Sequence, residues 1–461
     1  MAGRTPILLL AAIVALFAGG CRHVLQPDLE RLYGGSTAAA DQPPVILIPG
    51  LLGTRIVDRK NSDEIWIGSV FKLLFSDYRE LTLPIDPVTL EPATGDTMAG
   101  SITDRAAGRD FYGSIIRTLE ATAGYRRAEP GTRPADGGPF YYIFSYDWRQ
   151  DNVASARRLH AMIEQIRADH DDPDLEVDVI AHSMGGLITR YYLRYGTRDV
   201  LDDNDFPVNL EGAQRIRRVI LLGTPNLGSV NSLHAFIRGY AIGLTRIPTE
   251  VVATFPSVYQ LFPHPINDWI VTAEGKRLDR DVFSTRLWRR FQWSIFAPEV
   301  RSRIRERAGG GADGEHRLKL LEAYFHKHIE RARRFVWSLT VPTPEPMPEP
   351  VVLGGDCSPT PARIVVEEVN GKSMVRLWPD DLKRPVAGVN YRELMLQPGD
   401  GTVTKASLLA RQSADPSVPR HEYSHFPLDY PIFLCAEHDR LTQNLTFQDN
   451  LLHILLSRER E

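Results

Sequence analysis

Residues 177–192 constrain this chain more than any other stretch. They read V-D-V-I-A-H-S-M-G-G-L-I-T-R-Y-Y, in which the β-branched apolar residues of a buried strand give way to apolar residues at helical spacing. Ser183 lies between the predicted strand and the predicted helix. Such a sharp turn exposes its central side chain and leaves room only for small residues two positions before and after it. Ala181 and Gly185 fill those positions, so we expect Ser183 to be a nucleophile on a strained turn.

His182 directly precedes this serine. A histidine adjacent in sequence to the nucleophile points its ring away from the hydroxyl, so it is not a suitable general base. We therefore predict a structural role for His182 and expect the base elsewhere in the chain.

An early apolar run, P-V-I-L-I-P-G-L-L-G at residues 44–53, predicts a strand followed by a loop with two glycines. In acyl transfer, the developing oxyanion needs two donors, usually the backbone N–H after the nucleophile and one from such an early loop. We expect Met184 and Leu51 to supply them. A plain turn that ends the strand is the alternative interpretation of this loop.

Strands and helices alternate along much of the chain. Further strands are predicted at residues 140–144, 215–222, 351–355 and 431–436, and helices at 153–169 and 447–456. This order predicts a parallel sheet with right-handed crossovers. Together with the serine turn, it predicts an α/β-hydrolase fold, with a mostly parallel central sheet and helices on both faces. We assign this domain to residues 44–456.

Two segments interrupt the alternation. Residues 55–139 are irregular, with a dense apolar patch before a Pro-rich stretch, which suits a lid but equally a part of the core. Residues 230–340 form a predicted helical cap insertion. Between Arg286 and Arg334 this cap holds thirteen Lys or Arg against six Asp or Glu. Contact with an anionic membrane surface would explain that excess of cations, but we prefer a solvated helical face.

The N-terminus predicts export. Residues 1–20 hold one early positive charge, a short apolar run and small residues, as in a signal peptide. Cys21 follows directly, as in a lipoprotein signal whose cysteine is lipidated, and an ordinary secretory signal is the alternative. Residues 21–43 then form a predicted tether. We expect an exported, membrane-anchored lipoprotein of the bacterial cell envelope.

Composition adds few constraints. A net charge of −4 gives no indication of nucleic-acid binding. Besides Cys21 the chain has only Cys357 and Cys435, which either pair in an oxidising compartment or stay as two free buried thiols.

The remaining members of a catalytic triad should follow Ser183 in the order acid, then histidine. Asp400 lies in a G-D-G-T-V turn directly after a segment predicted to be extended, residues 393–396. Asp356 is the rival acid, but it follows a strand too early, with a hairpin and that extended segment still to come. We therefore expect Asp400 to be the acid.

His438 follows the last predicted strand, where an α/β hydrolase presents its general base. His421 and His425 precede that strand, and His453 falls within the final amphipathic helix. We therefore expect His438 to take the proton from the serine hydroxyl.

Six short motifs occur along the chain in a fixed order. They are I-P-G-L-L-G-T at residues 48–54, Y-D-W-R at 146–149, A-H-S-M-G-G at 181–186, G-T-P-N-L-G-S at 223–229, P-T-P at 359–361 and G-D-G-T-V at 399–403. Together they resemble the motifs of the lecithin:cholesterol acyltransferase family, over most of residues 44–456.

The resemblance implies the same nucleophile, acid, base and oxyanion donors, and a buried ion pair between Asp147 and Arg149. It also implies that fatty acyl groups move from phospholipids or related lipid esters to water or an alcohol, without a metal or a cofactor. The expected partners are a lipid substrate and a membrane surface, and protein partners stay unknown from the sequence. An esterase or lipase without acyl transfer, and a lipid-binding lipoprotein without activity, are the alternatives.

Overall fold

The computed structural model describes residues 26–34, 42–93, 95–106, 108–134, 138–344, 346–415, 417–422 and 424–457. The predicted signal peptide and Cys21 lie outside these residues. Within the described ranges, no helix is both long enough and apolar enough to cross a membrane.

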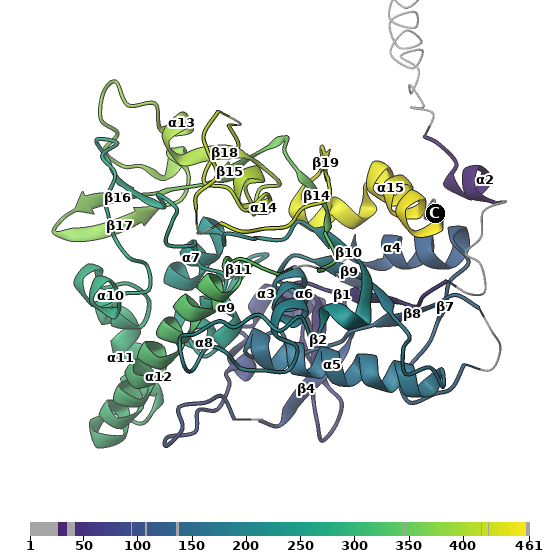
Figure 1. Ribbon diagram of the computed structural model, residues 1–461. Coiled ribbons are helices and arrows are strands. Elements are labelled where there is room, and N and C mark those ends of the chain that lie inside the picture. The colour runs from purple at the N-terminus through teal and green to yellow at the C-terminus, as the bar shows by residue number, and fades with distance from the viewer. Residues whose placement is uncertain are drawn as a thin grey trace, which may run out of the picture.

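A central sheet of seven strands organises the described part of the chain (Figure 1). Every neighbouring pair in it is parallel. From one edge to the other, the strands are β19(Pro431–Leu434), β14(Val351–Gly355), β10(Ile216–Leu222), β9(Val177–His182), β1(Val45–Ile48), β8(Phe140–Ile143) and β7(Arg126–Arg127). The α/β-hydrolase fold is therefore confirmed, and each central strand that the sequence predicted is present.

Helices cover both faces of this sheet. On β1, Ile46 and Ile48 pack beneath α5(Asn152–Asp169) and α6(Met184–Tyr195), while Val45 and Leu47 face the opposite side. That side carries α4(Gly113–Arg117), the π-helix η2(Thr118–Thr122) and α15(Leu445–Leu456). Burying each such aliphatic side chain contributes about 1.5–3 kcal/mol. Because both faces are buried, the strands read as continuous apolar runs rather than alternating ones.

The segment predicted as a lid divides into two parts. The first is a separate small sheet with its flanking helices: β2(Thr54–Asp58), β3(Glu64–Trp66), α3(Val70–Phe75), η1(Arg79–Leu81) and β4(Thr97–Ile102). Even this part is anchored, since Trp66 is buried against Trp148.

The second part, which follows the hairpin β5(Arg105–Ala106) and β6(Arg109–Asp110), belongs to the core. Ile115 and Leu119 are fully buried under the sheet, and β7 extends the sheet itself. The lid interpretation is therefore wrong for this part. Its elements are too short to show a clear period in the sequence.

The predicted cap insertion is mainly helical. Its elements are α7(Val230–Arg238), β11(Tyr240–Ile242), β12(Thr245–Ile247), α8(Thr249–Val252), α9(Pro256–Tyr259), β13(Ile270–Thr272), α10(Thr285–Phe291), η4(Ser294–Phe296), α11(Pro298–Arg307) and α12(Gly311–Ser338). However, β13 pairs with β16(Ile364–Val369), which forms a hairpin with β17(Lys372–Arg376). The cap therefore extends beyond the predicted boundary at residue 340.

Acidic residues from outside the basic segment pair with many of its cations. Arg303 and Arg307 both pair with the buried Glu250. Arg331 on α12 pairs with Asp151 at 2.9 Å. These ion pairs join the cap helices to each other and to the hydrolase core, so the fold itself accounts for much of the local positive charge.

The predicted tether is wrong for residues 29–33. They form α2(Leu29–Tyr33), which Asp28 caps by accepting a hydrogen bond from the backbone N–H of Arg31. Leu29 is buried in the core, and the Tyr33 hydroxyl donates to Asp449 on α15 at 2.8 Å. Five residues are too few for helical periodicity to appear in the sequence.

Candidate active site

Ser183 occupies the turn between β9 and α6. Its backbone has φ 53° and ψ −123°, a conformation that costs a non-glycine residue about 1–3 kcal/mol. The surroundings are crowded, because a Cβ atom on Gly185 would lie 2.8 Å from the backbone oxygens of Ile48 and Pro49. A Cβ atom on Gly50 would lie 2.7 Å from the Cβ of Ser183. The loop after β1 therefore packs directly on the serine turn, which explains the need for small residues there.

Three side chains that are far apart in the sequence meet at this turn. His438 Nε2 lies 2.9 Å from Ser183 Oγ, and His438 Nδ1 lies 2.7 Å from Asp400 Oδ2. His438 begins η6(His438–Gln443), directly after the loop that follows β19. The structure thus brings together the three residues predicted as nucleophile, base and acid. Their catalytic roles stay predictions.

Asp400 is buried and firmly held. Its Oδ1 accepts hydrogen bonds from the backbone N–H groups of Thr402 and Val403 at 2.9 and 2.7 Å, which leaves Oδ2 for His438. The backbone carbonyl of Asp400 also accepts the N–H of His438 at 2.9 Å. The acid therefore fixes both the ring and the backbone of the histidine.

The electrostatics of the pair suit a general base. Burial favours the neutral imidazole, but the charge of Asp400 and its hydrogen bond outweigh burial and raise the pKa of His438 above its ordinary value. The nearby Asp439 acts in the same direction. The site therefore stabilises the imidazolium that forms when His438 accepts a proton.

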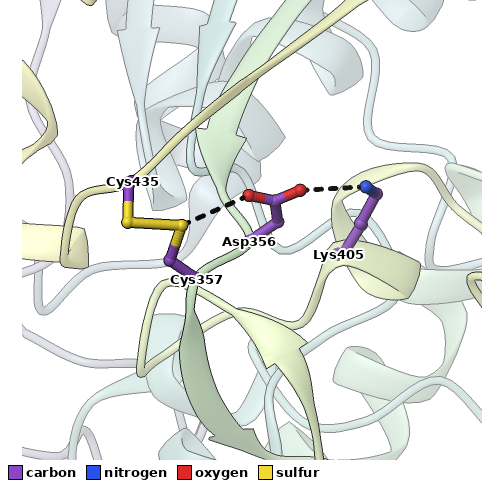
Figure 2. Close-up of a disulfide and its surroundings, with 4 residues drawn as sticks. All are labelled: Asp356, Cys357, Lys405 and Cys435. Carbon is purple, nitrogen blue, oxygen red and sulfur yellow. Dashed lines mark hydrogen bonds and ion pairs between the residues drawn. A yellow bond between two sulfur atoms is a disulfide. The ribbon is translucent and has the colours of Figure 1, made fainter.

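The rival residues are occupied elsewhere. Asp356 pairs with Lys405 at 3.0 Å and lies beside the disulfide, as Figure 2 shows. His421 and His425 line a different pocket from the one that Ser183 lines, and His453 lies near Ser457 on the exposed side of α15.

Cys357 and Cys435 form a disulfide with a Cα–Cα distance of 5.1 Å, which decides between the two alternatives left open by the sequence (Figure 2). Cys357 follows β14, and Cys435 precedes His438 by three residues. The cross-link therefore ties the loop that carries the histidine to the end of the neighbouring strand.

The predicted oxyanion donors flank the serine. Met184 is the first residue of α6, so its N–H has no acceptor within the helix. In the part of the chain that the structure describes, no backbone carbonyl or side chain accepts a hydrogen bond from the N–H of Leu51. Both groups are thus available to a ligand, and their role stays a prediction.

A cavity of about 730 Å³ opens beside the triad, whose three residues all line it. Most of its wall is apolar and comes from the loop after β1, the small β2–β4 sheet and the cap. The larger apolar side chains in this wall are Leu51, Leu52, Trp66, Ile67, Phe111, Tyr112, Tyr240, Ile242, Leu261, Trp378 and Val403. Arg109, Glu437 and Asp439 add charge to the lining. Among the described residues, no group of three or more His, Cys, Asp or Glu is arranged to hold a metal ion.

Sequence reasoning missed Tyr112. Its hydroxyl accepts a hydrogen bond from the N–H of Gly50 at 2.9 Å and lies 2.7 Å from His182 Nδ1. Tyr112 stands at the N-terminus of α4, where no sequence motif marks it. Only the tertiary fold brings it behind the serine turn.

Comparison with known proteins supports the relationship suggested by the motifs. A family model described as lecithin:cholesterol acyltransferase matches residues 141–295. A lysosomal phospholipase A and acyltransferase from Bos taurus is 24% identical over 237 residues, which cover 44% of this chain and 52% of that protein. Over this part of its length, the chain is similar to the lecithin:cholesterol acyltransferase family. The chain spans about half the length of the curated relative it matches, and the region that matches the family model includes Ser183 but not Asp400 or His438.

Solved structures agree with the fold. A chain in the crystal structure of the Tle4–Tli4 complex aligns over 98% of its own length with 90% of this protein, at 15% identity and a TM-score of 0.52. At that identity the likeness shows the fold alone. A lipase from Bacillus licheniformis aligns over 91% of this chain and 94% of its own at 13% identity, but its TM-score of 0.30 supports no inference.

Proposed function

We propose that this chain is a serine-dependent lipid acyl hydrolase or O-acyltransferase that acts on phospholipids or related lipid esters. The observation that carries the proposal is the hydrogen-bonded chain Ser183–His438–Asp400 at the wall of a largely apolar cavity. The similarity of residues 141–295 to the lecithin:cholesterol acyltransferase family supports the same class of activity.

The geometry provides for each proton transfer. The Oγ of Ser183 attacks the ester carbonyl carbon while His438 Nε2 takes its proton, and the oxyanion forms near the N–H groups of Leu51 and Met184. Collapse of this intermediate breaks the ester C–O bond, and the leaving alcohol takes the proton back from Nε2. Water or an acceptor alcohol then gives its proton to Nε2 and attacks the acyl carbon. Collapse of the second intermediate breaks the bond to Ser183 Oγ, which takes the proton back from Nε2, and the acyl product leaves. Asp400 holds the Nδ1–H throughout.

Several exposed apolar residues near the cavity support a membrane surface as the source of the substrate. Trp378 and the β11–β12 hairpin line the cavity, and Leu244 at the tip of that hairpin is 86% exposed. Helix α3 packs against β12 and ends at Phe75, which is 70% exposed. An apolar rim of this kind would gain free energy on entering the interfacial region of a bilayer.

For location, we propose an exported protein anchored in the bacterial envelope through a lipid on Cys21. The N-terminal sequence supports this proposal, and a disulfide is typical of an oxidising compartment. Cys21→Ser should release the protein from the membrane fraction, while an unchanged distribution would contradict lipid anchoring.

Covalent labelling tests the enzymatic proposal. A fluorophosphonate should label the wild-type protein, whereas Ser183→Ala should remain folded and unlabelled. Incubation with labelled phospholipid, with and without an added alcohol, then separates transfer from hydrolysis. Release of free fatty acid alone would indicate an esterase or lipase, and lipid binding without labelling would indicate a protein without activity.

Substitution at the rim tests the membrane-surface proposal. Leu244→Asp should lower kcat/KM on phospholipid vesicles at least tenfold and leave the hydrolysis of a soluble short-chain ester within twofold. Val88→Asp is the matched control, because Val88 is 87% exposed but lies near α12, where Lys327 bonds to Thr89. Equal losses for the two variants would contradict a specific docking rim.

A further inference from the structure

A hydrogen-bonded chain runs behind the triad and joins the loop after β1 to the loop that carries the base. The N–H of Gly50 donates to the Tyr112 hydroxyl at 2.9 Å, and this hydroxyl lies 2.7 Å from His182 Nδ1. His182 Nε2 lies 3.2 Å from the backbone carbonyl of His438. The two hydrogen bonds at the Tyr112 hydroxyl are buried, and the contact between His182 and His438 is partly buried.

The chemistry of the partners fixes every proton in this chain. A carbonyl oxygen only accepts, so Nε2 of His182 must carry a hydrogen and donate it to His438. If the ring is neutral, Nδ1 has a lone pair and accepts the Tyr112 O–H. The hydroxyl oxygen is then free to accept from Gly50. Burial lowers the pKa of His182 well below its ordinary value, and the nearby His438 adds to this effect, so the ring stays neutral.

We propose that Tyr112 and His182 are positioning residues that hold the oxyanion loop and the general base in place around the nucleophile. The inference rests on the proposed function of the triad. Tyr112 holds Gly50 in place, and it thereby positions the N–H of the neighbouring Leu51. His182 holds the backbone of His438 in place.

His182 links the serine turn to the loop that carries His438. His182 is covalently joined to Ser183, so a shift of its ring changes both the serine turn and the histidine loop. The His438 backbone is held by two bonds, one from its N–H to Asp400 and one from His182 to its carbonyl. Because the two rings lie with centroids 4.9 Å apart, a displaced His182 also loses its packing against the base.

Tyr112→Phe tests the proposal with the smallest change, since it removes one hydroxyl and keeps the ring that lines the cavity. It leaves the Gly50 N–H and His182 Nδ1 without their partner. We expect kcat on a soluble short-chain ester, and the rate of fluorophosphonate labelling, to fall at least tenfold with KM within twofold. Tyr195→Phe is the matched control, because the buried Tyr195 hydroxyl donates to the carbonyl of Ser338 at 2.7 Å, remote from the cavity lining. This control should lower the melting temperature similarly and keep wild-type kcat.

Variants at His182 separate positioning from packing. His182→Gln retains a side-chain N–H that can reach the His438 carbonyl, whereas His182→Leu retains only volume. Gln should therefore keep several-fold more kcat than Leu. Adding Tyr112→Phe to His182→Leu should lower kcat little further, because His182→Leu has already broken the series of hydrogen bonds.

The outcomes distinguish this inference from the proposed function. If the wild-type protein never labels, the serine mechanism fails and the inference fails with it. If the wild type labels and Tyr112→Phe labels at the same rate, only the positioning role is wrong. Equal kcat values for His182→Gln and His182→Leu would also overturn the positioning role. Fully additive effects of His182→Leu and Tyr112→Phe on kcat would overturn it as well.

Discussion

The disulfide between Cys357 and Cys435 should contribute substantially to stability. The two cysteines are 78 residues apart in the sequence, so the cross-link closes a long loop in the unfolded chain. In the chain-entropy treatment a loop of this length lowers the stability of the unfolded state by about 4.5 kcal/mol. For a domain of about 400 residues the entropy of unfolding is about 0.8 kcal/mol per kelvin. Removal of the disulfide should therefore lower the melting temperature by about 5 °C.

The test replaces both cysteines by serine and compares melting temperatures by scanning calorimetry at one fixed scan rate. Activity should respond less than stability at temperatures well below the transition. Although Cys435 is close to His438, the backbone of His438 keeps its hydrogen bonds to Asp400 and His182. We therefore expect the fluorophosphonate labelling rate at 25 °C to stay within about threefold of wild type, since those bonds are retained.

A neighbouring ion pair provides the control. Lys405 and Asp356 are both partly exposed, so Lys405→Met should cost no more than about 1 kcal/mol and leave the melting temperature within about 1–2 °C. A double cysteine variant that melts within 1 °C of wild type would refute the loop-entropy reasoning. A tenfold loss of labelling at 25 °C would show that the cross-link itself positions the base.

Three further predictions concern the site and its support. Because Asp400 raises the pKa of His438, kcat/KM should fall at acidic pH with a midpoint above about pH 6.5. Asp400→Asn should move this midpoint below that value. A wild-type midpoint below about pH 6.5 would contradict the prediction that Asp400 supports His438 as the base. Gly185→Ala should lower the labelling rate at least tenfold, because its Cβ would press on the backbone below the oxyanion loop, and an unchanged rate would count against tight packing there. Asp147→Ala should destabilise by about 3–5 kcal/mol, measured as a lower melting temperature, because it leaves the buried Arg149 unpaired; a shift under 1 °C would show that the pair contributes little.

The parts of the fold that the sequence predicted correctly are those with strong local signals. The strands of the central sheet are long apolar runs, and the serine turn needs small residues at fixed positions. The Asp147–Arg149 pair, implied by the family resemblance, is buried with its closest atoms 2.7 Å apart. These features depend on few residues, so one sequence is enough to recognise them.

The features that the sequence did not predict correctly are those that depend on contacts between distant parts of the chain. Residues 393–396 read as extended, but most of them lie in the short helix α13(Tyr391–Met395), which begins with Asn390 capping the N–H of Glu393. Several cations of the cap pair with Glu250 and Asp151, which lie outside the basic segment, so the sequence of that segment alone does not show these partners. Tyr112 approaches Gly50 and His182 only because α4 packs under the sheet. No local pattern contains that information.

A short antiparallel pair of strands sets the position of Asp400, the predicted acid, although Asp400 lies 45 residues after the end of β14 in the sequence. β14 ends at the edge of the sheet where functional side chains gather, but Asp356, the next residue, pairs with Lys405. The chain then forms β15(Ser358–Pro361) and returns as β18(Leu396–Gly399), antiparallel to it. Since β15 starts beside the end of β14, this return necessarily brings Asp400 back to the sheet edge. The intervening excursion carries the β16–β17 hairpin and Trp378, which lines the cavity. The β15–β18 ladder thus holds Asp400 against His438, and the excursion that this ladder closes adds Trp378 to the cavity wall.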